Sequence, residues 1–403
     1  MSDVLILGAG LVGSTLATAL GAHGLTATVI DPADPERILA ADFDGRATAV
    51  ASASHRMLAA IGVAERLAGK GCPIASIRVT DGLEPGALDF VPEASDGALG
   101  VMYENRHLRR ALHEAASAAP GVDLRMQRRA IAVDRGEGGV TATLDDGSVV
   151  RAQLLVAAEG RASPTREAAG IRMAKWRYDH VAMIATFGHE LPHEHCAYEI
   201  FYPAGPFAIL PLSDDEHGHR SALVWTVDAA DAPGFLKLSD RAWLHEAEKR
   251  MDGFLGRLGP LSKRTSYPLG FHHAATITDE RLALVGDAAH GIHPIAGQGL
   301  NLGFRDVATL VEVLVEGKRL GLDMGDAELL KRYERWRGLD TFLVALATDG
   351  LTRLFGVPGK GASAVRRIGI SAVNAIPPLK NRFMAEARGE SGDLPKLLQG
   401  MTV

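Results

Sequence analysis

Residues 286–303 read GDAAHGIHPIAGQGLNLG, and this stretch decides the fold that the sequence predicts. The mostly apolar run 281–285 before it predicts a buried strand, and the near-helical spacing of apolar residues over 302–314 predicts a helix packed on that strand. The glycines in between let backbone N–H groups approach a bound group closely, because they carry no Cβ. The amides of Gly299 and Asn301 would then lie at a helix N-terminus, where partial positive charge favours an anion.

A dinucleotide offers two anions to such a loop: a pyrophosphate and the N1–C2=O edge of a reduced flavin. An isolated glycine-rich loop is more often an ordinary strand–loop–helix unit, so the interpretation depends on matching motifs elsewhere. The N-terminus supplies one such motif. A short apolar strand leads into Gly8, Gly10 and Gly13, which have GxGxxG spacing. A helix follows, and then a second strand, 26–30, that is followed by Asp31. This complete pattern predicts dinucleotide binding, with Asp31 on the adenosine ribose and FAD or NAD favoured over NADP.

Composition narrows the class of protein. The chain has 403 residues, enough for one large or two medium domains, and its net charge of −6 argues against nucleic acid as a partner. Cys72 and Cys196 lie far apart without CxxC spacing, which indicates a reducing, cytoplasmic compartment, no disulfide and no metal site. The apolar stretch 4–20 contains three glycines and follows an acidic start, so we interpret it as the first strand and helix rather than a membrane segment.

The middle of the chain alternates helices and strands. We expect a helix over 45–61, a second helix that Asn105 caps, and an antiparallel meander of four strands over 123–156. The last strand runs into Glu159-Gly160, a second strand-to-helix turn.

Residues 176–271 lose the alternation of strands and helices. Their pattern predicts antiparallel strands with one helix, which is typical of a separate sheet domain inserted before the first domain resumes at Arg281. The region after residue 327 is predicted to be mostly helical.

Together these motifs match a known family. The chain resembles the class A FAD-dependent aromatic monooxygenases, which share the fold of p-hydroxybenzoate hydroxylase, and within them the ubiquinone-biosynthesis hydroxylases. Three motifs carry the resemblance: GxGxxG with Asp31, the turn at Glu159, and 286–301, with 293–306 the most specific run. The family usually has Asp-Gly at the middle motif, so Glu159 is a departure whose role stays open. Similarity extends to 44–49 and 349–355, and so covers essentially the whole chain.

The resemblance implies an α/β fold with three parts. A Rossmann-type FAD-binding domain would comprise 1–73, 104–173 and 272–326. An antiparallel-sheet substrate domain would comprise 74–103 and 174–271, and C-terminal helices would follow over 327–403.

The resemblance also implies roles for individual residues. Asp31 would hold the adenosine ribose and Asp287 the ribityl chain, while Arg46 and Arg106 would lie along the FAD toward its pyrophosphate. The cofactor-binding residues would be Gly8, Gly10, Gly13, Asp31, Arg46, Arg106, Glu159, Gly160, Gly286, Asp287, Pro294, Gly299, Leu300 and Asn301, and the catalytic residues beside the reacting ring would be His293, Pro294, Gly297 and Gln298.

In such enzymes the reduced flavin reacts with O2 to give a C4a-hydroperoxide that attacks an electron-rich aromatic ring, and the protein positions the ring and excludes water. A phenol would gain from partial deprotonation, but the sequence does not identify a base. His290 and His293 are nearest, and hydrogen bonds to backbone or solvent account for them equally well. Because the chain has no second dinucleotide fingerprint, we expect NAD(P)H to bind transiently or a partner reductase to supply electrons.

The ring carbon that is hydroxylated stays open, because the pocket residues of the sheet are not identifiable from sequence. Phe201, Tyr202, Pro203 and 207–211 suit the wall over the flavin and a plain sheet core equally well.

The C-terminal region gives a separate indication of the substrate. Between 350 and 385 the chain carries no Asp or Glu, and apolar residues are interleaved with basic ones. Short helices of this kind lie on an anionic bilayer or dock a partner, and a helix pair packed on the body with a solvated basic face explains the pattern as well. The basic residues are Arg353, Lys360, Arg366, Arg367, Lys380 and Arg382.

Three hypotheses follow. The first is a hydroxylase of a polyprenyl phenol in ubiquinone biosynthesis, cytoplasmic and peripheral on the inner face of the membrane, beside other proteins of that pathway. The second is a class A hydroxylase of a small soluble aromatic acid, and the third is a non-catalytic flavin-binding scaffold of a biosynthetic complex. The basic tail and the run 293–306 favour the first.

Overall fold

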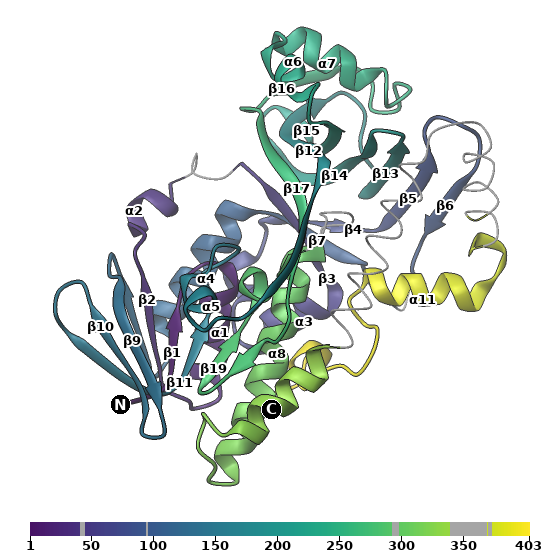
Figure 1. Ribbon diagram of the computed structural model, residues 1–403. Coiled ribbons are helices and arrows are strands. Elements are labelled where there is room, and N and C mark those ends of the chain that lie inside the picture. The colour runs from purple at the N-terminus through teal and green to yellow at the C-terminus, as the bar shows by residue number, and fades with distance from the viewer. Residues whose placement is uncertain (41–44, 94–95, 292–297, 339–368, 370–372) are drawn as a thin grey trace.

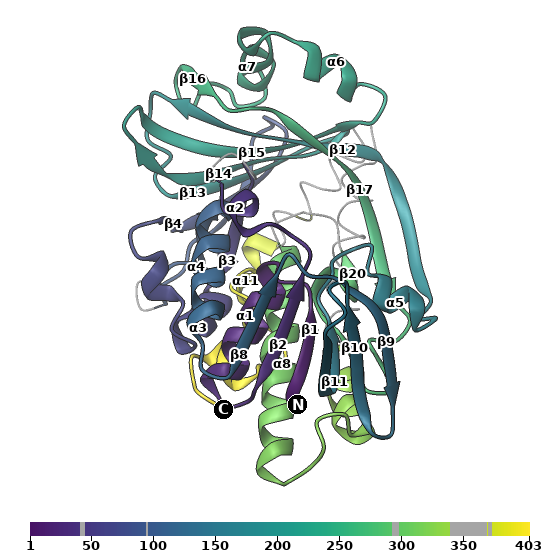
Figure 2. The same cartoon turned by 90° about the vertical axis from the view of Figure 1, so that its left-hand side faces the viewer.

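The computed structural model describes residues 1–40, 45–93, 96–291, 298–338, 369 and 373–403. Within them the strands form one sheet of eight, one of nine and one of three. The eight-stranded sheet and its helices make the lower part of the molecule, and the nine-stranded sheet arches over it (Figures 1 and 2). The predicted α/β fold with a largely antiparallel second sheet is confirmed.

The lower sheet is parallel at its centre. Its strand order is β18-β19-β11-β1-β2-β8, and the hairpin β9–β10 joins it through β11. The central strand is apolar from Val4 to Leu7 and fully buried over 4–6, which is typical of a parallel strand covered on both faces. The strands are β1 Ser2–Leu7, β2 Ala27–Asp31, β8 Val122–Met126, β9 Ala130–Gly136, β10 Gly139–Leu144, β11 Val149–Ala157, β18 Thr278–Asp279 and β19 Leu282–Leu284.

Three helices pack together against this sheet: α1 Leu11–Ala22, α4 Asn105–Ala118 and α8 Gln298–Arg319. The chain is helical again over 327–338. The remaining helical segments are α2 Pro35–Ile38, α3 Ser52–Ala60, η1 Ala64–Leu67, α5 Pro164–Ala168, α6 Ala232–Lys237, α7 Asp240–Glu248, η2 Gly286–Ala288, α11 Pro377–Ala387 and η4 Lys396–Gln399.

The upper sheet has the order β20-β17-β12-β15-β14-β13-β5-β6, and β16 pairs with β12. One face carries aromatic residues such as Phe207 and Trp225, which pack with Trp243 of α7. The other face packs on the small sheet β3-β7-β4 of the lower part. The strands are β3 Ala47–Ala51, β4 Gly71–Ile74, β5 Ser76–Asp81, β6 Ala87–Phe90, β7 Gly100–Glu104, β12 Met173–His189, β13 Cys196–Tyr202, β14 Gly205–Asp215, β15 Gly218–Asp228, β16 Leu258–Leu261, β17 Thr265–Ala274 and β20 His290–Gly291.

Three local predictions were wrong. The segment 47–51 is the strand β3 paired with β7, so the helix begins only at Ser52. Asn105 does not cap α4; Glu104 occupies the cap position, and the Asn105 side chain accepts a hydrogen bond from Thr48 of β3. The first strand of the expected meander, β8, instead pairs in parallel with β2 at the sheet edge.

A buried carboxylate on α8 joins three separate segments. Asp306 is fully buried, and its Oδ2 accepts hydrogen bonds from the Gly286 backbone amide at 2.8 Å and from His290 Nε2 at 2.7 Å. Its Oδ1 accepts from Arg337 Nε at 2.7 Å. Burial by itself raises the pKa of this carboxyl, but the charges and hydrogen bonds of His290 and Arg337 outweigh burial and hold the pKa below its ordinary value. Asp306 is therefore ionised and fixes the start of the glycine-rich loop.

Replacing Asp306 by Asn is expected to lower the free energy of unfolding by about 3–5 kcal/mol, because the negative charge of a buried ion pair with Arg337 is lost. Chemical denaturation measures this change. The matched control is Asp89→Asn, which breaks the exposed Arg78–Asp89 pair and should cost about 0–1 kcal/mol. Equal effects of the two substitutions would contradict the role given to Asp306.

Candidate functional site

The N-terminal glycines form a backbone cradle at the end of β1. A Cβ on Gly8 would lie 2.4 Å from the Ala158 carbonyl oxygen, and a Cβ on Gly13 would lie 1.9 Å from the Gly8 oxygen, so both positions require glycine for packing. A Cβ on Gly10 would meet nothing within 4 Å. Because Gly10 precedes α1, whose first amides lack intrahelical partners, its open side is where a phosphate can approach the helix N-terminus.

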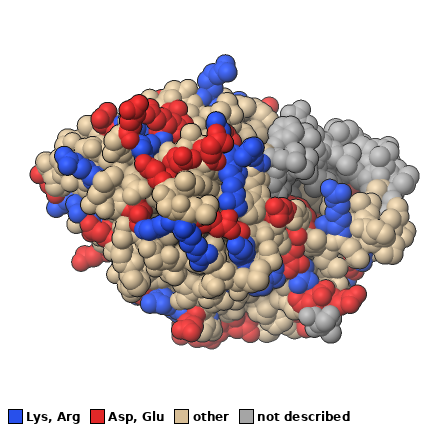
Figure 3. All heavy atoms as spheres, turned by 90° about the horizontal axis from the view of Figure 1, so that it is seen from below, with Lys and Arg blue, Asp and Glu red and all other residues tan. Residues whose placement is uncertain are grey.

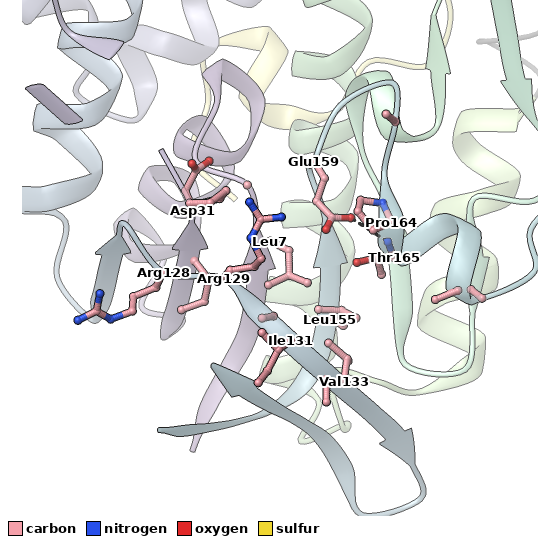
Figure 4. A pocket seen from close by; sticks show the side chains of 18 of the residues that line it. Leu7, Asp31, Arg128, Arg129, Ile131, Val133, Leu155, Glu159, Pro164 and Thr165 are labelled. Carbon is pink, nitrogen blue, oxygen red and sulfur yellow. Dashed lines mark hydrogen bonds between the residues drawn. The ribbon is translucent and has the colours of Figure 1, made fainter. Parts of the chain in front are cut away.

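Asp31 lies at the end of β2, beside this cradle. Its Oδ2 accepts a hydrogen bond from the Ala9 amide at 2.6 Å and its Oδ1 accepts from the Ala33 amide at 2.7 Å, so the carboxylate is held in a fixed orientation. Each oxygen keeps a further lone pair for a ribose hydroxyl. Asp31 and Glu159 line one pocket together with residues of β9, and Figure 4 shows the two acids on either side of Leu7.

Glu159 uses one oxygen within its own turn. Its Oε2 accepts hydrogen bonds from the Ser163 hydroxyl at 2.6 Å and from the Thr165 amide at 3.2 Å, so it stabilises the start of α5. Arg166 of α5 is buried and donates to the Ala288 carbonyl at 3.0 Å, which links this turn to the loop after β19. Gly160 has φ +79°, a conformation that favours glycine.

The two arginines predicted to lie along the cofactor are both engaged by the protein. Arg46 lies over the ring of Tyr267, with its guanidinium carbon 5.3 Å from the ring centroid. Arg106 pairs with Glu104 at 3.0 Å, and Arg220 of β15 donates to the same carboxylate at 3.0 Å. Burial acts to raise the pKa of Glu104, but the hydrogen bonds from the two arginines outweigh it and lower the pKa. Glu104, which the sequence did not single out, thus connects the two parts of the molecule.

The loop after β19 carries an exposed acid. Asp287 is exposed, whereas its neighbours Gly286, Ala288 and Ala289 are buried. Gly286 has φ +59°, and a Cβ there would lie 3.1 Å from Val12 of α1, so the loop packs directly on the helix of the cradle. The structure therefore brings the N-terminal motif, the turn at 158–160 and the Asp287 loop together around one helix.

The start of α8 is anchored from the side. The Asn301 side chain accepts from the Ala51 amide and donates to the Ala49 carbonyl, both at 2.9 Å, so it holds the helix to β3. Gly299 and Leu300 lie in the first turn of α8, and a Cβ on Gly299 would meet nothing within 4 Å. Of the four predicted catalytic residues, Gln298 begins α8, and His293, Pro294 and Gly297 lie outside the described residues.

His290 has a structural partner rather than a free ring. It is buried and bonded to Asp306, which favours a role in fixing the loop over a role as base. His272 is also fixed, because its Nε2 lies 2.9 Å from the Asp287 carbonyl oxygen.

The residues that the sequence suggested either for the wall over the flavin or for the sheet core lie on both faces of the upper sheet. Phe207 and Ile209 pack in the cluster under α6 and α7, and the Tyr202 hydroxyl donates to the Arg250 carbonyl on that side. Leu210 belongs instead to the cluster that faces the lower part. Residues of 207–211 therefore alternate between sheet core and the wall that faces the cofactor domain.

A cluster of Cys72, His193 and His195 has metal-ligand types within 4.8 Å of one another. Both ring nitrogens of His193 are already engaged, since Nδ1 accepts from the His195 amide and Nε2 lies 3.0 Å from the Leu212 carbonyl. Burial raises the pKa of the Cys72 thiol to about 11, which opposes formation of the thiolate ligand. We assign no metal to this cluster.

Comparisons with known proteins identify the family to which this fold and its glycine cradle belong. A family model described as FAD binding domain matches residues 1–339. The ubiquinone hydroxylase UbiL of Rhodospirillum rubrum is 46% identical over 404 residues, covering 100% of this chain and 93% of that protein. The 3-demethoxyubiquinol 3-hydroxylase of Escherichia coli is 33% identical over 390 residues, covering 96% of this chain and 98% of that protein.

The fold is also seen in solved structures. The p-nitrophenol 4-monooxygenase PnpA of Pseudomonas putida superimposes with a TM-score of 0.79 at 18% identity, covering 98% of this chain and 99% of that chain. The chain belongs to the FAD binding domain family and, within it, groups with the ubiquinone hydroxylases. It is an FAD-dependent monooxygenase.

Replacing Gly10 by Ala is expected to leave the fold intact and to weaken FAD binding. The new Cβ points into open space in the protein, where the pyrophosphate would approach, so affinity should fall by roughly tenfold or more. The flavin absorbance per protein and the thermal unfolding temperature measure the two effects separately.

Two controls bracket this test. Gly13→Ala should destabilise the protein, because its Cβ would clash with the Gly8 oxygen, and Gly138→Ala, at a turn with open space around it, should change neither quantity. A Gly10→Ala protein with full flavin content would contradict the assigned approach of the phosphate.

Proposed function

We propose that this protein hydroxylates the aromatic ring of a polyprenylated phenol in ubiquinone biosynthesis, with O2 as the oxygen source. The observation that carries the proposal is the 46% identity, over the whole chain, to a protein named ubiquinone hydroxylase. The similarity to a 3-demethoxyubiquinol 3-hydroxylase, again over nearly the full length of both chains, supports the same substrate class.

The described residues fit FAD. Gly8 and Gly13 have no room for a Cβ, Asp31 bonds to the Ala9 amide beside them, and the loop that carries the exposed Asp287 packs on α1. Gly10 and the first amides of α1 would bind the pyrophosphate, Asp31 the adenosine ribose and Asp287 the ribityl chain. The cofactor, when bound, supplies the activation of O2.

The protein's own task is to place and shield the ring. The amides of Gly299, Leu300 and Asn301 at the start of α8 would stabilise negative charge on the flavin edge. β17 descends from the upper sheet and pairs with β20, directly after the Asp287 loop. The aromatic ring would therefore lie between this loop and the face of the upper sheet that is turned toward it. Electrons would come from NAD(P)H bound transiently or from a partner reductase.

The C-terminal region would bring the enzyme to a lipid-soluble substrate. No helix of the described chain has the length and apolar character needed to cross a bilayer. In α11 and just before it, Ile376 and Phe383 are exposed at 48% and 40%, beside Lys380 and Arg382. Seen from below, acidic and basic side chains are interspersed over the described surface (Figure 3), so apolar contact would matter as much as charge. The other basic residues, 353–367, lie outside the described residues.

Cells that lack this gene are expected to accumulate a ubiquinone precursor short of one or more oxygens, because the hydroxylated carbon stays unsubstituted. Mass spectrometry of lipid extracts identifies the precursor, and its structure names the carbon. A plasmid-borne wild-type gene should restore ubiquinone, and the Gly10→Ala gene should restore less. Normal ubiquinone in the deletion strain would count against the proposal and favour a soluble aromatic substrate.

Substituting Ser for both Ile376 and Phe383 is expected to reduce binding to anionic lipid vesicles several-fold, because apolar area is lost from the surface that would contact lipid. Vesicle flotation of the purified protein measures the bound fraction. The control is Leu320→Ser, which removes an apolar side chain that is 76% exposed at the end of α8. Equal binding by all three proteins would rule out α11 as the contact.

A further inference from the structure

Strand β13 carries a buried carboxyl group that the fold does not explain. Glu199 is 8% exposed, and its side chain has no hydrogen bond or ion pair with any described residue. A buried polar group without a partner lowers stability, so such groups persist where another role requires them.

The register of the sheet shows which way Glu199 points. Its neighbours Tyr198 and Ile200 pack in the aromatic cluster under α6 and α7. Ala197 packs in the cluster that includes β3, β4 and β7 of the lower part. Because successive side chains of a strand point to opposite faces, Glu199 shares the face of Ala197 and is turned toward the FAD-binding part of the molecule.

The positions around Glu199 on this face are small or apolar. Val79 of β5 and Ala208 of β14 lie directly opposite it in the two adjacent strands, and Val224 follows on β15. None of these side chains can donate or accept a hydrogen bond. Burial in this environment raises the pKa of the Glu199 carboxyl to about 8.

Other titratable groups on this face are few among the described residues. Asp81 of β5 lies opposite Phe201, one position further along the same face. Arg220 of β15 lies on the same face and donates to Glu104 of β7, whose pKa is lowered by its hydrogen bonds to Arg106 and Arg220. In the apolar cluster that packs against the face from β3, β4, β7 and α11, Cys72 is the member that titrates. Its thiol stays protonated up to about pH 11, so it does not follow the pH range in which Glu199 ionises.

We infer that Glu199 is a catalytic residue that binds the ring hydroxyl of the phenol substrate and accepts its proton. This inference rests on the proposed function, which places the aromatic ring against this face of the sheet. The phenol O–H bond breaks, a new O–H bond forms on the carboxylate, and the electron pair left on the phenol oxygen raises electron density at the ring carbons ortho and para to it. The carboxyl returns the proton to the same oxygen after hydroxylation.

The test compares Glu199→Gln with wild type in a single turnover. The FAD-loaded protein is photoreduced, then mixed with O2 and 2-farnesylphenol in detergent, and hydroxylated product is measured by mass spectrometry over pH 6–9. Photoreduction removes any dependence on the electron donor. The rate of wild-type product formation should rise with pH as the carboxylate forms, whereas Glu199→Gln should be about 100-fold slower with a flat profile.

The matched control is Glu190→Gln, which removes an exposed carboxylate paired with Arg257 on the same domain. It should keep the wild-type rate and pH profile. All three proteins should hold equal FAD, which excludes misfolding as the cause of a slow rate. A second measurement, the change in flavin absorbance on titration with 2-farnesylphenol, should show weaker binding by Glu199→Gln alone.

The outcomes separate the inference from the proposed function. Wild-type protein that binds 2-farnesylphenol but never hydroxylates it would contradict the proposed function, and the binding titration still decides whether Glu199 contacts the phenol. Wild-type and Glu199→Gln proteins with equal rates, equal pH profiles and equal binding would overturn the inference alone.

Thermal unfolding gives an independent check on burial. The pKa of Glu199 is raised in the folded state. Its carboxyl therefore makes its full contribution to the free energy of unfolding below about pH 4.5, and this contribution is lost as the pH rises through about 8. Glu199→Gln should therefore become progressively more stable than wild type from pH 5 to pH 9. A constant difference would show that the carboxyl is solvated.

Discussion

The geometry of the loop after β19 depends on the hydrogen bonds and ion pairs of Asp306. This carboxylate is fully buried, and such a charge is tolerated because a backbone amide, a histidine and an arginine all donate to it. Its partners belong to the loop after β19, to β20 and to the helix over 327–338, so one side chain of α8 sets their relative positions. The exposed acid Asp287 follows the bound amide of Gly286 by one residue. The backbone just before this exposed acid is therefore held from the protein interior.

The upper sheet must bury both of its faces, and it does so with different chemistry. Aromatic residues fill the space under α6 and α7, as in an ordinary core. The opposite face packs on the small sheet β3-β7-β4 mainly through small and apolar residues, and a few charged groups lie among them. Arg220 donates to Glu104 and joins the two parts of the molecule, whereas Glu199 has no such partner among the described residues. Its isolation on this face is what separates it from the structural acids.

Patterns confined to one segment could be read from the sequence, and contacts between distant segments could not. Gly8, Gly10, Gly13 and Asp31 lie within one strand–helix–strand unit, so local spacing located the cradle. Residues 47–51, Ala-Thr-Ala-Val-Ala, suit either a helix or a strand, and pairing with β7, some 50 residues later, decides for the strand. The partners of Asp306 and the isolation of Glu199 depend on packing between separate elements, which no local pattern encodes. The family resemblance supplied the cofactor and the reaction, but not these contacts.

Glu159 is one methylene longer than the Asp that the family usually has at this position, and the structure accommodates the extra length. The longer side chain folds back, and one of its oxygens accepts from Ser163 and from the Thr165 amide at the start of α5. α5 in turn holds Arg166 against the Ala288 carbonyl, beside Asp287. The acid thus stabilises the turn that carries it, and α5 links this turn to the loop after β19. A direct contact with the cofactor is not needed to explain why a carboxylate is kept here, since an amide or apolar side chain would leave the start of α5 without its charged acceptor.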